Sequence, residues 1–95
     1  MTHLRQRMIG DMQLRGLSEK TQQIYVHAVR QLAEHYGQSP DKISEEDIRQ
    51  YFLFLKNTKQ AAPSTIRVAL GGIKFFYKKT LRKDLKTLDL VRPGQ

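Results

Sequence analysis

The sequence contains no cysteine and no tryptophan, and it has no long apolar run. Without cysteine, neither a disulfide framework nor a thiolate metal site can form. No apolar stretch approaches the roughly 18 residues that a membrane-spanning helix needs, and the first residues lack the apolar core of a signal peptide. His3, His27 and His35 are not grouped at metal-ligand spacing. We therefore expect a cytoplasmic protein with no metal, no cofactor and no membrane contact.

Catalytic motifs are also absent from the 95 residues. There is no glycine-rich dinucleotide or phosphate loop, no HExxH helix and no cysteine nucleophile. The acidic residues between Asp41 and Asp47 fall on a turn and a helix start, where they stabilise the turn and the helix dipole. We therefore expect no enzyme active site in this chain.

Positive charge is abundant, and it is unevenly distributed. The chain has 17 Lys and Arg against 9 Asp and Glu, a net charge of +8. Residues 1–55 hold seven of each sign, whereas residues 56–95 hold ten basic and two acidic side chains. Such an excess attracts polyanions, of which nucleic acid is the commonest. The alternative is a basic surface that serves only solubility.

Apolar spacing predicts four helices over residues 2–15, 18–36, 44–57 and 63–81. Ser18, Ser44 and Ser64 are the expected N-caps, and Gly16 and Gly37 are expected to end the first two helices. No strand alternation or internal repeat is present. Because the connections are short, sequential helices should pack as neighbours in one compact, all-α four-helix orthogonal bundle.

The fourth predicted helix contains Gly71 and Gly72 in its interior. Each costs about 1 kcal/mol of helix stability relative to alanine. A close approach of another helix, or of DNA, would explain both, and the sequence does not distinguish these alternatives.

Two predicted helix faces carry groups that suit DNA. Cations on one side of a helix can enter a major groove, while hydroxyl groups and free N–H groups at a helix start bind phosphate. The candidate residues are Ser18, Lys20, Thr21, Gln22 and Arg30 on the second helix, and Ser64, Thr65, Arg67, Gly71, Lys74 and Lys78 on the fourth. A purely structural alternative applies to each set, because such stripes are often solvated faces and Ser18 and Ser64 would be caps in any case.

Three segments together resemble a known family. They are Leu17-Ser18-Glu19-Lys20-Thr21 with Tyr25, Val29, Leu32 and Tyr36; Ile43-Ser44 with Asp47, Ile48, Tyr51 and Leu55; and Ser64-Thr65 with Leu70, Ile73, Phe76 and Tyr77. This series, over residues 4–81, resembles the N-terminal core-binding, SAM-like domain of tyrosine recombinases and phage-type integrases. The resemblance implies one half of a C-shaped clamp around duplex DNA. It implies DNA contacts near Thr21, at Thr65 and on the side of the fourth helix that holds Arg67, Gly71 and Lys74.

The same resemblance sets the expected organisation. Residues 1–83 would form the core-binding domain, and residues 84–95 a basic linker towards a catalytic domain that is absent here. The expected partners are duplex DNA, that catalytic domain and neighbouring recombinase protomers. The expected role is DNA integration and recombination. The alternatives are a helical protein–protein interaction module, with Ile24, Phe54 and Phe75 as its apolar contacts, and a helix-turn-helix regulator, which the long loop before residue 63 disfavours.

Overall fold

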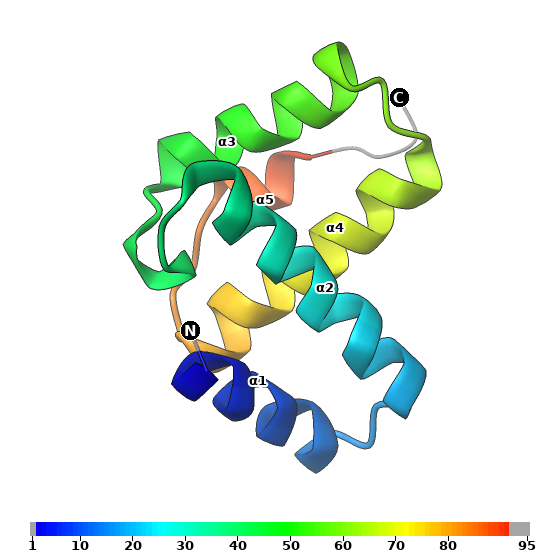
Figure 1. Ribbon diagram of the computed structural model, residues 1–95, viewed down its shortest axis with the longest axis vertical. Coiled ribbons are helices and arrows are strands. Elements are labelled where there is room, and N and C mark those ends of the chain that lie inside the picture. Colours follow the sequence, from blue (N-terminus) through cyan, green and yellow to red (C-terminus); the bar gives the residue numbers. More distant parts are fainter. Residues whose placement is uncertain (1, 92–95) are drawn as a thin grey trace.

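The computed structural model describes residues 2–91, and these residues form an all-helical bundle (Figure 1). The described part contains no strand, which confirms the predicted fold class. The elements in chain order are α1 (Thr2–Leu14), α2 (Glu19–Tyr36), the 3-10 turn η1 (Pro40–Lys42), α3 (Glu45–Leu53), its π-helical end η2 (Phe54–Thr58), α4 (Pro63–Phe75), its π-helical end η3 (Phe76–Thr80) and α5 (Thr87–Leu90).

α2 and α3 begin and end where their local chemistry predicts. The Ser18 hydroxyl accepts a hydrogen bond from the Thr21 N–H at 3.2 Å, and Ser44 accepts one from the Asp47 N–H at 3.1 Å. Gly37 ends α2 at a φ of 61°, a left-handed conformation that costs glycine little. The predicted caps at Ser18 and Ser44 are therefore confirmed.

The start of α4 differs from the prediction. The helix begins at Pro63, and Ala62 is its N-cap, so Ser64 lies inside the first turn and caps nothing. Proline suits this first position because its missing N–H would have no helical partner and its φ is already helical. The helix therefore starts two residues earlier than it would with Ser64 as its N-cap.

The core lies where α1, α2, α3 and α4 meet. Its most buried side chains are Met8 and Met12 from α1, Val29 and Leu32 from α2, Ile48 and Phe52 from α3, and Ile66, Ile73, Phe76 and Tyr77 from α4 and η3. Burial of each such side chain stabilises the fold by about 1.5–3 kcal/mol. The predicted apolar stripes are thus the core, and the Tyr77 hydroxyl donates a hydrogen bond to the Pro40 carbonyl.

α2 crosses α4 at the paired glycines. A Cβ on Gly72 would lie 3.0 Å from both the Cα and the carbonyl oxygen of Tyr25, and 3.1 Å from the Ala28 Cβ. A Cβ on Gly71 would meet the Tyr25 hydroxyl at 3.0 Å. Of the two explanations that the sequence left open for these glycines, the structure supports the close approach of a second helix.

The segment after Leu81 is more ordered than the predicted linker. Residues 87–90 form α5, and its Leu88 is buried in the core. The Thr87 N–H donates to the Glu45 carboxylate at 2.9 Å, and Asp89 pairs with Lys74 at 3.3 Å. The sequence predicted no regular structure after Leu81, and this prediction is wrong for residues 87–90. The contacts of Thr87, Leu88 and Asp89 attach this short helix to the rest of the bundle. Residues 92–95 of the predicted linker lie outside the described part of the chain.

Candidate nucleic-acid interface

The N-terminal halves of α2 and α4 diverge from their crossing towards the same side of the molecule (Figure 1). Thr21 lies one helical turn before Tyr25, and Thr65 lies two turns before Gly72. Since Tyr25 and Gly72 are in contact, both threonines lie on the helix sides that face the other helix. We give the name splayed face to the following exposed or half-buried residues of these two half-helices: the cap Ser18 with Lys20, Thr21 and Ile24 of α2, and Ser64, Thr65, Arg67 and Val68 of α4.

The α2 part of the splayed face is locally ordered. The Ser18 hydroxyl donates to the Thr21 Oγ1 at 2.9 Å while it accepts from the Thr21 N–H. Lys20 is exposed and Thr21 is half-buried. The two bonded hydroxyl groups therefore lie at the positive end of the α2 dipole, next in sequence to the exposed Lys20.

The α4 part of the splayed face is open. Ser64, Thr65 and Arg67 are all exposed, and no side chain caps the first turn. The first N–H groups of a helix have no partner within it, so those of Ser64 and Thr65 remain available to an outside acceptor. The Ser18 side chain caps α2, whereas no side chain bonds to the first N–H groups of α4.

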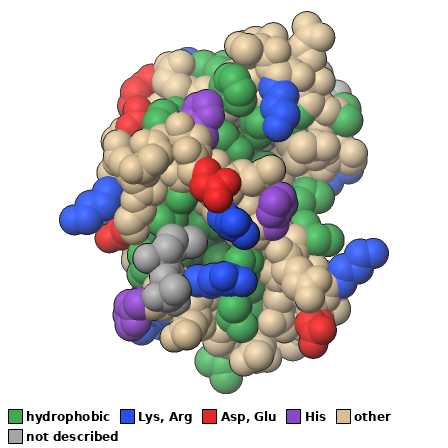
Figure 2. All heavy atoms as spheres, in the orientation of Figure 1, with side chains coloured by type: hydrophobic (Ala, Val, Ile, Leu, Met, Phe, Trp, Pro, Cys, Tyr) green, Lys and Arg blue, Asp and Glu red, His purple; other side chains and the backbone are tan. Residues whose placement is uncertain are grey.

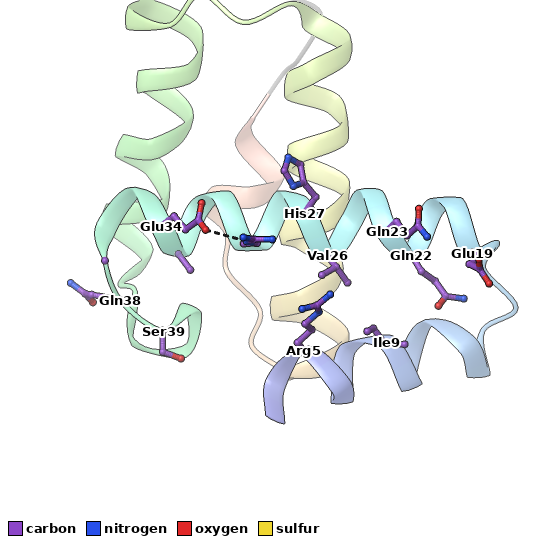
Figure 3. A pocket seen from close by; sticks show the side chains of 13 residues that line it. Arg5, Ile9, Glu19, Gln22, Gln23, Val26, His27, Glu34, Gln38 and Ser39 are labelled. Atoms are coloured by element: carbon purple, nitrogen blue, oxygen red, sulfur yellow. Dashed lines mark hydrogen bonds and ion pairs between the residues drawn. The ribbon is translucent and has the colours of Figure 1, made fainter. Parts of the chain in front are cut away.

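Gln22 and Arg30 of the predicted site lie elsewhere, on a groove of about 710 Å³ between α1 and α2 (Figure 3). Arg5 and Ile9 of α1 form the opposite wall. The Gln22 amide donates to the Leu17 carbonyl at 3.0 Å, and Arg30 pairs with Glu34 at 3.0 Å. Because Gln22 and Arg30 line this groove and have partners within α2 and just before it, they do not join the residues of the splayed face.

Gly71, Lys74 and Lys78, which were also predicted to contact DNA, have different surroundings in the structure. Gly71 is covered by the Tyr25 ring, and Lys74 forms a partly exposed ion pair with Asp89. Lys78 is exposed and lies beyond the crossing, on η3. The stripe that the spacing predicted is thus covered at Gly71 by the Tyr25 side chain from α2.

Sequence reasoning missed the role of Tyr25. Its apolar spacing assigned it to the core, yet it is half-buried, covers Gly71 and has its ring centroid 6.3 Å from that of Phe75. Ile24 and Val68 are exposed by 37% and 40% and add apolar area beside the hydroxyl groups of the splayed face. Only the paired glycines hinted at this contact, because they predict a close neighbour without naming it.

Charge of one sign does not gather on the α2 side of the molecule. Figure 2 shows Lys and Arg, Asp and Glu, and His side chains interspersed over the face turned to the viewer, where α2 lies in front. Among residues 2–91, no group of three potential metal ligands comes together, and no helix is long and apolar enough to cross a membrane.

Residues 4–87 match the family described as the N-terminal SAM-like domain of phage integrase. The chain is 45% identical over 84 residues to y4qK of Sinorhizobium fredii, which is named as an integrase/recombinase, and the match covers 88% of this chain and 27% of that protein. It is 35% identical over 78 residues to an integrase/recombinase of Escherichia coli, covering 80% of this chain and 23% of the relative. No solved structure matches the chain.

The described residues form an all-helical bundle in which α2 and α4 cross in close contact. The chain belongs to the phage integrase N-terminal SAM-like domain family, as the resemblance in the sequence predicted. It spans about a quarter of the length of the curated relatives that it matches.

Proposed function

We propose that the chain binds duplex DNA through the splayed face, as the non-catalytic half of a clamp that belongs to a site-specific recombinase. The observation that carries the proposal is the first turn of α4, which has no side-chain cap and exposes Ser64 and Thr65. The helix dipole adds roughly half a positive charge at this turn, where N–H groups lack partners. A DNA phosphate oxygen supplies both the acceptor and the negative charge that this turn lacks.

The residues of the splayed face take different parts in this proposal. The hydroxyls of Thr21 and Thr65 and the first N–H groups of α4 bind phosphate and orient the domain on the duplex. Arg67 is long and exposed, so its guanidinium can reach a phosphate or the O6 and N7 atoms of guanine in a major groove about 12 Å wide. Lys20 contributes charge from the second half-helix.

We assign the catalytic step to a part of the protein outside these 95 residues. Relatives named integrase/recombinase are about four times longer than their match to this chain. We propose that a further domain of the same protein cuts and rejoins the DNA strand, with neighbouring protomers assembled on the same DNA. Alone, the chain should then bind weakly, because the gain from tethering two contacts on one duplex is lost.

Fluorescence anisotropy with a labelled duplex tests the proposal at several salt concentrations. The Lys20→Ala, Arg67→Ala double variant should bind at least tenfold more weakly, and the slope of log affinity against log salt should fall by about 1.8 if two phosphate contacts are lost. The matched control is Arg7→Ala, Arg49→Ala, which removes the same charge from exposed sites on α1 and α3.

The control should bind within about threefold of the wild type, since distant charges act only through a screened field. If both double variants weakened duplex binding equally, the loss would be a general effect of net charge, and the splayed face would not be the binding site. Absence of binding by the wild type at low salt would overturn the proposed function itself.

A further inference from the structure

A second group of cations surrounds a hollow at the other end of α4. The hollow has a volume of about 370 Å³ and is lined by Arg15, Lys78, Lys79, Arg82, Lys83 and Asp84. We call these five cations and their acidic neighbour the basic hollow. Four of the cations come from η3 and the turn after it, and Arg15 comes from the end of α1, so packing of α1 against η3 creates the group.

None of the five cations forms an ion pair with another described residue. The cations in the three ion pairs among the described residues are Arg30, Arg49 and Lys74, and all three lie outside the basic hollow. Asp84 is the one acid in its lining, and Asp41 acts on Lys83 from outside it. The helix end contributes roughly half a negative charge. Cations gathered in this way repel one another, so a polyanion that entered the hollow would relieve unfavourable energy as well as gain contacts.

Two of these residues have a distinctive local geometry, Arg15 in its side chain and Arg82 in its backbone. The Arg15 guanidinium carbon lies 5.8 Å from the centroid of the Phe75 ring, within the range of a cation–π contact. Arg82 has a φ of 58°, a left-handed conformation that glycine adopts at little cost and arginine does not. The fold thus places an arginine where glycine would be the cheaper residue.

The end of α3 shows that the left-handed position does not require an arginine. There the Lys59 N–H donates to the Phe54 carbonyl and the Ala61 N–H donates to the Leu55 carbonyl, and Gln60 has a φ of 52°. At the end of α4, the same two bonds run from Leu81 to Phe76 and from Lys83 to Tyr77. The two helix ends share one backbone geometry, with glutamine in one and arginine in the other.

We infer that the basic hollow is a second binding site for the DNA phosphate backbone, in addition to the splayed face. The inference rests on the proposed function, since it assigns the hollow to the same duplex. Lys78 lies three helical turns after Arg67, roughly 16 Å along the axis, on the same side of α4. That distance corresponds to about five base pairs of one strand, so one duplex can reach both regions.

The sharpest test exploits the shared backbone geometry. Arg82→Gly removes a cation and also the left-handed strain, so it should weaken duplex binding about threefold to tenfold while the thermal unfolding midpoint stays level or rises. The matched control, Gln60→Gly, should leave the midpoint level or higher and affinity unchanged. The salt slope should fall by about 0.9 for Arg82→Gly and remain constant for Gln60→Gly.

A purely structural role for Arg82 predicts that affinity and the unfolding midpoint change together. If the wild type binds the duplex and Arg82→Gly matches Gln60→Gly in affinity and salt slope, the basic hollow is not a binding site, and the proposed function of the splayed face stands.

A second measurement separates the hollow from the proposed function. In NMR titrations of the 95-residue chain with sodium tripolyphosphate, the amides of residues 15 and 78–83 should shift saturably, and these shifts should be reduced in Arg82→Gly. If no duplex binds but these shifts occur, the hollow is a polyphosphate site and its assignment to a duplex is overturned with the proposed function. If tripolyphosphate causes no saturable shift, the hollow binds no phosphate and the inference fails.

Discussion

The two halves of α4 have different surroundings. In Pro63–Leu70, the exposed residues include Ser64, Thr65 and Arg67, and only Ile66 and Ala69 are buried. From Gly72 to Thr80, the helix and its π-helical end contact α1 and α2 and supply buried residues including Ile73, Phe76 and Tyr77. One helix therefore combines a half that builds the core with a half whose polar side chains are exposed to solvent. Substitutions in the second half should change stability, and those in the first half should change binding.

The largest expected effect is at Gly72. Gly72→Val should lower the free energy of unfolding by about 3 kcal/mol, because its new atoms would meet the backbone of Tyr25, which cannot move aside. The matched variant is Gly71→Ala, whose Cβ would meet only the end of the Tyr25 side chain. There the gain in helix propensity, about 1 kcal/mol, should offset the contact. Thermal and urea unfolding measure both, and equal stabilities would contradict the described crossing of α2 and α4.

A smaller effect is expected at Tyr77. Tyr77→Phe should cost about 2 kcal/mol, because the buried Pro40 carbonyl loses its hydrogen-bond donor. Burial, and secondarily the charge of Asp41, raise the pKa of Tyr77 above its ordinary value. A raised pKa in the folded state means that this contribution is complete below about pH 10 and is lost as the pH rises above it.

Urea unfolding between pH 8 and pH 11 tests this alkaline dependence. The wild type should lose stability above about pH 10, and Tyr77→Phe should lose less over the same range. The control is Tyr25→Phe, at a half-buried site. Identical pH profiles for the wild type and Tyr77→Phe would show that Tyr77 does not carry the dependence.

The smallest effect is expected where the two halves of α4 meet, at the ion pair between Lys74 and Asp89. Both side chains are substantially exposed, 41% and 56%, so Asp89→Asn should change the free energy of unfolding by less than about 0.5 kcal/mol. The variant removes a negative charge beside a predicted DNA contact, and duplex affinity should rise about twofold to threefold at low salt. A fall in affinity would indicate that α5, rather than Lys74, faces the DNA.

The sequence predicted the elements better than their contacts. Apolar spacing and serine caps correctly placed α2 and α3, because these signals act within a few residues of each other. Ser64 was assigned as a cap because serine is a common cap, and the proline before it was the stronger signal. α5 was missed since a four-residue helix has too few positions to show a period, and only its burial of Leu88 reveals it.

The structure brings together some of the predicted site residues and separates others. Ser18, Lys20, Thr21, Ser64, Thr65 and Arg67 lie on the splayed face, whereas Gln22, Arg30, Gly71 and Lys74 have structural contacts elsewhere. Helical spacing tells which residues share one side of a helix, but it contains no information on which neighbouring helix covers that side. Arg15 illustrates the same limit, because it joins Lys78 in the basic hollow from a position 63 residues earlier in the chain.

By itself, the sequence determined the helical class, the family, the core stripes and the concentration of positive charge after residue 55. These properties depend on residue types and on local spacing, which a chain carries whether or not it is folded. Only the tertiary structure decided that α2 covers Gly71, that Asp89 neutralises Lys74, and that Arg15 joins the cations of η3. Each of these depends on the angle and position at which two helices pack, and that geometry is set by the complementary shapes of distant side chains.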